Sequence, residues 1–82
     1  MLKVELVSPE KKVWSGEAVS VSARTLAGDL GILTDHIPLL GVLVDGKVVI
    51  NGTDGSVSEF NVNGGFLSVS NNRVSILAEA TN

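Results

Sequence analysis

The sequence has no cysteine, one histidine, one tryptophan and two prolines among 82 residues. Without cysteine there is no disulfide and no thiolate nucleophile or metal ligand, so nothing points to a disulfide-stabilised secreted domain. No apolar run approaches the roughly 20 residues of a membrane-spanning helix. Lys3 and Glu5 interrupt the N-terminus where a signal peptide would be apolar. These absences predict a soluble, intracellular chain with no direct membrane insertion.

Positive charge is also scarce. Six basic residues stand against nine acidic ones, which gives a formal net charge of −3, and Lys11-Lys12 is the only adjacent basic pair. A nucleic-acid-binding surface needs concentrated positive charge to displace counterions from phosphates. We therefore expect no nucleic-acid partner.

Apolar residues make up 44% of the chain and charged residues only 18%, which excludes intrinsic disorder and is enough for one domain. Segments 2–7, 19–24 and 74–79 alternate in a period of two, as half-buried strands do. The residues expected to face inward are Leu2, Val4, Leu6, Val19, Val21, Ala23, Val74, Ile76 and Ala78. Turn-forming pairs recur about every ten residues, and this spacing predicts an all-β sandwich or barrel without helices.

Two details of this pattern make specific predictions. Asp45-Gly46 separates the apolar segments 39–44 and 47–50, so we expect a hairpin turn there. Within segment 56–62, Val57 is out of phase with Phe60 and Val62, which predicts a β-bulge.

Few residues are candidates for chemistry. His36 is the only histidine, the side chain type that titrates near neutral pH, and a small hydrolase using it is one hypothesis. No serine stands in a nucleophile-elbow context, so a hydrogen-bonded loop or contact residue is the simpler interpretation. One histidine, no cysteine and no Asp-x-Asp spacing offer no metal site. We therefore expect no catalytic residue, no metal and no cofactor.

Lys47 suggests a different class of function. Lipoyl and biotinyl carrier domains are β-sandwiches of similar length that carry their modified lysine at a hairpin tip. Here Lys47 follows the expected Asp45-Gly46 turn and enters a strand. A carrier domain modified at Lys47 is the alternative hypothesis, and a solvated lysine at a strand start is its simpler explanation.

Segment 28–33, Gly-Asp-Leu-Gly-Ile-Leu, is too apolar and too rich in glycine for an ordinary solvated loop. It lacks the glycine spacing and the lysine of a phosphate-binding loop. We expect part of it to pack inward as a strand and part to form a patch for a partner, with Asp29 projecting at the tip.

Three blocks carry a resemblance to a known family. They are Val7-Ser8-Pro9-Glu10 with Val13-Trp14-Ser15-Gly16, then Gly28-Asp29-Leu30-Gly31-Ile32-Leu33 with His36-Ile37-Pro38-Leu39, then Gly64-Gly65-Phe66-Leu67 with Val74-Ser75-Ile76-Leu77-Ala78. In this order they resemble the N-terminal domain of the ε subunit of F-type ATP synthases, over nearly the whole chain. Trp14 stands where phenylalanine is commoner in that family.

The resemblance implies one domain over residues 1–82, a ten-stranded β-sandwich of two five-stranded sheets. It implies an accessory subunit without catalysis or cofactor, located in the central stalk on the cytoplasmic side of the bacterial membrane as a peripheral part of the complex. Such a subunit docks on the γ subunit and on the c ring and rotates with them. It thereby couples proton passage to ATP synthesis.

The resemblance also implies which residues meet the partners. Gly28, Asp29, Leu30 and Gly31 fall where the acidic loop of the family meets the c ring, while Ser8 and His36 fall on the side that faces γ. Most bacterial members continue into a C-terminal helical hairpin, which these 82 residues do not include. ATP binding and helix-mediated inhibition are therefore not expected of this chain.

Overall fold

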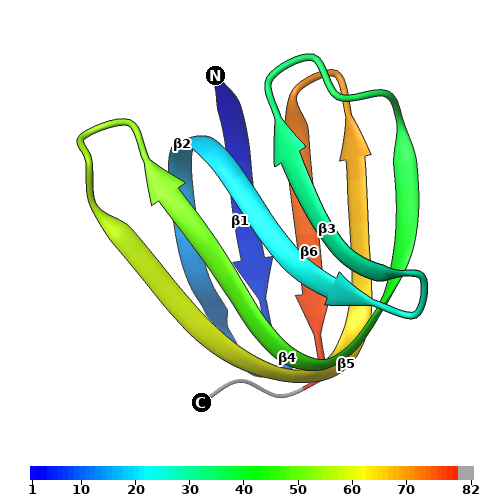
Figure 1. Cartoon of the computed structure of the whole chain (residues 1–82). Coiled ribbons are helices and arrows are strands. Elements are labelled where there is room, and N and C mark those ends of the chain that lie inside the picture. Colours follow the sequence, from blue (N-terminus) through cyan, green and yellow to red (C-terminus); the bar gives the residue numbers. More distant parts are fainter. Residues whose placement is uncertain (80–82) are drawn as a thin grey trace.

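The computed structural model describes residues 1–79, and within that range the chain forms six β-strands and no helix (Figure 1). No helix in those residues is long and apolar enough to cross a membrane. Three strands have six residues and three have fourteen. They are β1 (Leu2–Val7), β2 (Lys12–Thr25), β3 (Gly28–Leu33), β4 (Leu39–Gly52), β5 (Val57–Ser70) and β6 (Arg73–Ala78).

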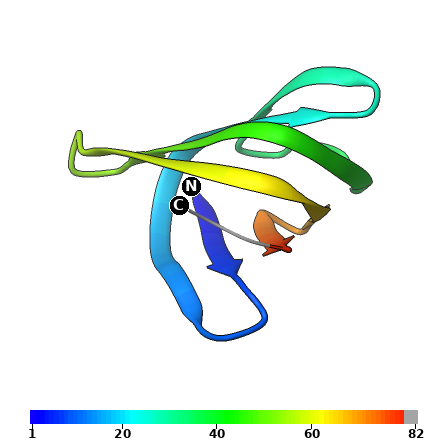
Figure 2. The same ribbon diagram turned by 90° about the horizontal axis from the view of Figure 1, so that it is seen from below.

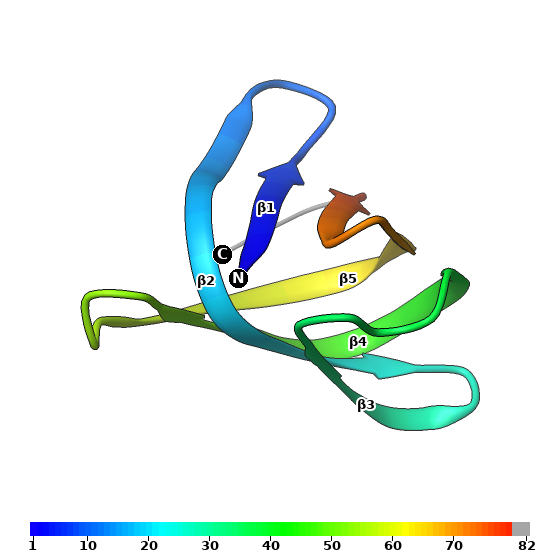
Figure 3. The same cartoon turned by 90° about the horizontal axis from the view of Figure 1, so that it is seen from above.

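The strands form one sheet that closes on itself. Their order is β1-β6-β5-β4-β2-β3, and β1 also pairs with β2. All pairs are antiparallel except β1 with β6, which is parallel. The views from below and above show the long strands curving from one side of the molecule to the other (Figures 2 and 3). The result is a barrel-like sandwich.

In each long strand, the residues that face inward change once between odd and even positions. In β5 the buried residues change from Val62 to Gly65 and Leu67, and in β4 they change from Leu43 to Val48. Because neighbouring residues of a strand point to opposite faces, such a change marks the place where the strand passes between layers. In β5 this place is Gly64-Gly65, whose φ angles are 89° and 128°.

The all-β class is confirmed, but the predicted count of ten strands in two five-stranded sheets is not, since the described residues form six strands. Most of the difference arises because β2, β4 and β5 each run through both layers as one bent strand.

The hairpin predicted at Asp45-Gly46 is wrong. Both residues lie within β4, opposite Asn63 and Val62 of β5, and neither has a positive φ. Gly46 has a packing role instead, because a Cβ there would lie 3.1 Å from the Cβ of Arg24. The same dipeptide that favours a tight turn here permits a close approach between strands.

The bulge predicted in segment 56–62 is also wrong. The register between β4 and β5 has no shift from Leu39 opposite Val69 to Asn51 opposite Val57. Val57 is out of phase simply because its side chain faces outward, with 59% of its surface exposed.

One apolar cluster fills the space between the layers. The predicted inward residues of β1 and β6 are all buried, as are Val21 and Ala23 of β2. Val19 was expected to be buried and is half exposed, because the register of β2 against β4 shifts between Ala18 and Ser20. Trp14 packs against the cluster from its edge.

Candidate docking surfaces

The segment expected to form an acidic loop is a strand. Gly28–Leu33 is β3, and it pairs with the C-terminal half of β2. Leu26 and Ala27 form the turn, so the expectation that Asp29 lies at the tip is wrong. The Leu26 N–H donates a hydrogen bond to the Val42 carbonyl at 2.9 Å, which attaches the turn to β4.

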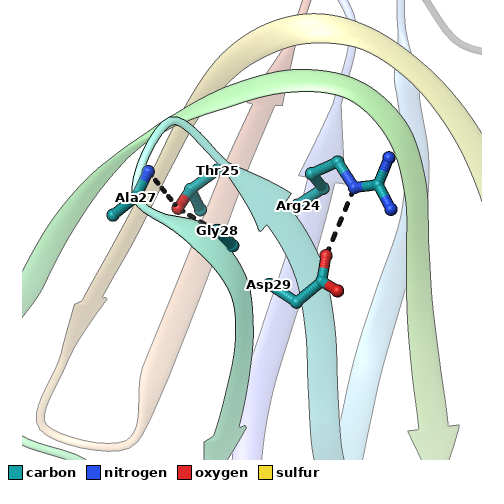
Figure 4. Close-up of polar contacts among 5 residues, drawn as sticks. All are labelled: Arg24, Thr25, Ala27, Gly28 and Asp29. Carbon is teal, nitrogen blue, oxygen red and sulfur yellow. Dashed lines mark hydrogen bonds and ion pairs between the residues drawn. The ribbon is translucent and has the colours of Figure 1, made fainter.

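Thr25 organises the turn from inside. Its Oγ1 donates to the Gly28 carbonyl at 2.9 Å and accepts from the Ala27 N–H at 3.2 Å (Figure 4). Thr25 is the buried polar residue of the described structure, and both of its bonds close this hairpin. Gly28 has a φ of 115°, a conformation that favours glycine.

Asp29 lies on the outer face of this hairpin, directly opposite Arg24. The Arg24 Nε donates to the Asp29 Oδ1 at 3.2 Å, and the two side chains are 60% and 81% exposed (Figure 4). A groove of about 500 Å³ runs along this face, and Arg24, Asp29 and Lys47 are among the residues that line it.

The other predicted residues of this segment divide between core and surface. Leu30 is half-buried and packs against the apolar core, while Gly31 is exposed with no atom within 4 Å of the position of a Cβ. The segment therefore both packs inward and presents a surface, as the sequence predicts.

Ser8 and His36 lie in two different connections. Ser8 is in the turn between β1 and β2, where its N–H and its Oγ both donate to the Lys11 carbonyl, at 2.9 and 3.2 Å. His36 is in the connection between β3 and β4. Figure 1 shows the first connection at the lower end of the strands and the second at the upper end. The fold does not bring the two residues together.

The His36 ring is engaged by the backbone. Its Nδ1 lies 2.7 Å from the Ile37 carbonyl oxygen, and because a carbonyl only accepts, Nδ1 carries the proton. Within residues 1–79 no serine or carboxylate is hydrogen-bonded to this ring, and no three His, Asp or Glu residues gather to hold a metal. The loop-residue interpretation of His36 fits this geometry better than a hydrolase does.

Lys47 lies in the middle of β4, opposite Asn61, and its Nζ is 3.2 Å from the Glu59 Oε1. It is therefore not at a hairpin tip, which is the position that a carrier lysine needs. The geometry gives the carrier hypothesis no support.

An exposed apolar row crosses the outer face of the sheet, and the sequence alone did not reveal it. Val42 of β4 lies opposite Phe66 of β5, Phe66 lies opposite Leu77 of β6, and Leu77 lies opposite Val7 of β1. Leu26 joins the row through its bond to Val42. The exposed fractions of Leu26, Val42, Phe66 and Leu77 are 73%, 42%, 52% and 51%.

The surroundings of the apolar row are mixed, since the exposed Leu40 lies opposite Ser68 and the exposed Glu5 lies opposite Ser75. The neighbouring outward residues of β5 and β6 include Ser68 and Ser75, which lie opposite each other. Ser8 directly follows Val7 at one end of the row. The connection that carries His36 and the exposed Ile37 lies at the opposite end of the strands, beside the β5–β6 turn. The apolar row thus lies beside the connection that carries Ser8 and away from the connection that carries His36.

Comparison with known proteins identifies the family. Residues 1–82 match the family described as ATP synthase, Delta/Epsilon chain, beta-sandwich domain. The ATP synthase epsilon chain of Streptomyces avermitilis is 51% identical over 78 residues, which are 95% of this chain and 63% of that protein. That of Micrococcus luteus is 52% identical over 77 residues, which are 94% and 85%. The chain thus spans less than two thirds of the Streptomyces protein.

Solved structures share the fold at lower identity. A chain of the Euglena gracilis mitochondrial ATP synthase (OSCP/F1/c-ring) has a TM-score of 0.92 at 20% identity, with 99% of this chain and 52% of that chain covered. A chain of the Tetrahymena thermophila mitochondrial ATP synthase (central stalk/c-ring) has a TM-score of 0.82 at 24% identity, covering 99% and 65%. With the family match over the whole sequence, this chain belongs to the β-sandwich domains of ATP synthase delta/epsilon chains.

Proposed function

We propose that this chain is a non-catalytic central-stalk subunit of an F-type ATP synthase. It docks on the γ subunit and on the c ring, and it couples proton translocation to ATP synthesis from the cytoplasmic side of the bacterial membrane, as a peripheral part of the complex. Family membership and the epsilon-chain relatives support the assignment to this complex.

The apolar row is the observation that carries docking on γ. Its five members have no charge, and the core of a protein interface is likewise poor in charge and rich in aromatic and large apolar side chains. A contiguous exposed apolar patch marks an interaction site more often than it marks ordinary surface. Ser8, one of the two residues expected to face γ, directly follows Val7 at one end of the row, so we assign the row and Ser8 to one interface. His36 lies at the opposite end of the strands and is a separate expected contact with γ.

Docking on the c ring is assigned to the outer face of the β2–β3 hairpin. Asp29 is the charged member of its proposed contact residues, with a side chain that is 81% exposed, and Leu30 attaches the strand to the core. A carboxylate held on a fixed hairpin can select a partner of complementary charge without reordering a loop.

Replacing Phe66 and Leu77 together by serine tests the γ interface. Both side chains point outward, so the fold is retained, while the charge-free centre of the interface is lost. We expect the variant not to co-purify with γ under conditions in which the wild type does.

Val57→Ser is the matched control, since Val57 is an exposed apolar residue of the same strand outside the row. It should retain γ. Retention of γ by the Phe66/Leu77 variant as well would refute the proposed interface, and circular dichroism verifies that each variant is folded.

A further inference from the structure

We propose that Arg24 and Asp29 form a single recognition element, in which Arg24 positions the Asp29 carboxylate and offers its own terminal nitrogens to the same partner. This inference rests on the proposed docking of the hairpin on the c ring and adds a residue and a partner chemistry to it.

The pairing begins with the register. Arg24 of β2 and Asp29 of β3 are direct cross-strand partners, so both side chains leave the sheet on the same face. Among residues 1–79, the guanidinium bonds through Nε alone, at 3.2 Å to Oδ1. Figure 4 shows the two terminal nitrogens of Arg24 pointing away from Asp29. A guanidinium has five N–H donors, so this arrangement leaves most of them for another acceptor.

Gly46 explains why the Arg24 side chain lies where it does. A Cβ on Gly46 would be 3.1 Å from Cβ, 3.5 Å from Cδ and 3.8 Å from Cγ of Arg24. Gly46 is extended backbone without a positive φ, so the conformation of the strand does not require glycine. The missing side chain instead leaves the space that the arginine stem occupies, and this allows the stem to lie along the groove.

The exposure of the pair argues against a role in stability. Both side chains are more than half exposed, and ion pairs in such surroundings contribute little to folding. What the pair does provide is a fixed cation next to a fixed anion. The neighbouring groove cation, Lys47, is engaged differently, by Glu59 of β5.

The partner that fits this element is a polar loop carrying a basic side chain beside a carbonyl or carboxylate oxygen. The base would pair with Asp29 and the oxygen would accept from the terminal nitrogens of Arg24. A loop that is only basic would be repelled by Arg24, and one that is only acidic would be repelled by Asp29. The pair therefore selects for both groups at once.

The test measures the affinity of the full chain for c rings in nanodiscs. We expect Asp29→Asn to weaken binding about tenfold and Arg24→Met, which keeps the stem, to weaken it about fivefold. The double variant should lose less than the product of the two factors, because Arg24 acts partly through Asp29. The salt dependence of the dissociation constant should be shallower for Arg24→Met than for the wild type.

Three further variants sharpen the result. Lys47→Met is the matched control for loss of a groove cation and should bind within twofold of the wild type. Arg24→Lys restores the charge without the planar fork and should rescue binding only in part. Gly46→Ala should weaken binding two- to threefold with the chain still folded, because it displaces the stem.

The outcomes separate the two proposals. The joint element is overturned if Asp29→Asn weakens binding while Arg24→Met binds like the wild type. It is also overturned if the two losses multiply in the double variant. Both outcomes leave c-ring docking intact. Wild-type binding of Asp29→Asn overturns both.

Discussion

Asp35 and Asn72, which are 37 residues apart in sequence, hold each other through two hydrogen bonds. The Asp35 N–H donates to the Asn72 Oδ1 at 2.6 Å, and the Asn72 Nδ2 donates to the Asp35 Oδ1 at 3.2 Å. Both residues have positive φ angles, 66° and 61°. The Asn72 carbonyl also accepts from the Lys3 N–H at 2.8 Å. The connection that carries His36 is thus attached to the β5–β6 turn and, through Asn72, to β1.

Replacing Asn72 by alanine should lower the free energy of unfolding by about 2–3 kcal/mol, since it removes two hydrogen bonds and puts alanine in the left-handed region, which asparagine tolerates better. Urea denaturation measures the change. Asn72→Gly is the control because it removes the same bonds and tolerates the φ angle, so it should lose about 1 kcal/mol less than Asn72→Ala. Equal losses in the two variants would contradict the backbone part of this explanation.

Gly65→Ala should be among the most destabilising substitutions in the sheet. Gly65 has a φ of 128°, and its Cβ would overlap the Leu77 carbonyl oxygen and lie 2.9 Å from the Ala78 Cα. We expect a loss of about 3 kcal/mol or more, measured by thermal or urea denaturation.

Gly31→Ala is the control for that experiment. It has open space at its Cβ position and no positive φ, so it should leave stability within about 1 kcal/mol of the wild type. A mild effect of Gly65→Ala would mean that β5 can straighten where it passes between the layers.

Asp54 makes a small part of the stability depend on pH. Its pKa is lowered by the hydrogen bond from the Ser56 hydroxyl and then by that from the Ser56 N–H, at 2.7 and 3.0 Å to Oδ1. Because the pKa is lower in the folded state, the carboxylate stabilises the fold above the unfolded pKa of about 3.9. That stabilisation is lost as the pH falls through the folded pKa.

The stability difference between the wild type and Asp54→Asn should therefore be present at pH 7 and shrink below about pH 4. Urea denaturation across this range measures it. Ser56→Ala, which removes the hydroxyl donor, should reduce the same pH dependence. A difference that stays constant down to pH 2 would rule out the hydrogen-bonded carboxylate as its source.

Thr25→Val should disturb the hairpin that carries Asp29. The substitution keeps the shape but removes the bonds to Gly28 and Ala27, so about 1–3 kcal/mol of stability should be lost. Hydrogen exchange of the Ala27 amide should become faster. Thr25→Ser keeps the hydroxyl and should preserve the slow exchange, and fast exchange in Thr25→Ser as well would contradict the hydroxyl as the group that protects this amide.

Alternation within a strand was readable from the sequence because it depends only on neighbouring residues. It correctly predicted the inward residues of β1 and β6. Where two strands pack together, a residue pair that usually marks a turn can have a different structural reason. Asp45-Gly46 is a turn signature by itself, and only the stem of Arg24 across the sheet explains the glycine.

The apolar row shows more clearly which features local sequence patterns cannot predict. Its members come from four strands and a turn, and each alone is an unremarkable side chain: Val7, Leu26, Val42, Phe66 and Leu77. Only the register between β1, β4, β5 and β6 aligns them. Asp29 and His36, in contrast, were predicted as contact residues because they belong to a contiguous motif that resembles a known family.

The pairing of β4 has a mechanical consequence for the proposed role. β4 pairs with β5 along nearly its whole length and also with β2, so the hairpin bearing Asp29 and the strands bearing Phe66 and Leu77 belong to one hydrogen-bonded ladder. A sideways load applied to the hairpin reaches the apolar row through strand-to-strand bonds, without crossing a connecting loop. Both proposed contacts would then turn in phase, with little elastic energy stored between them.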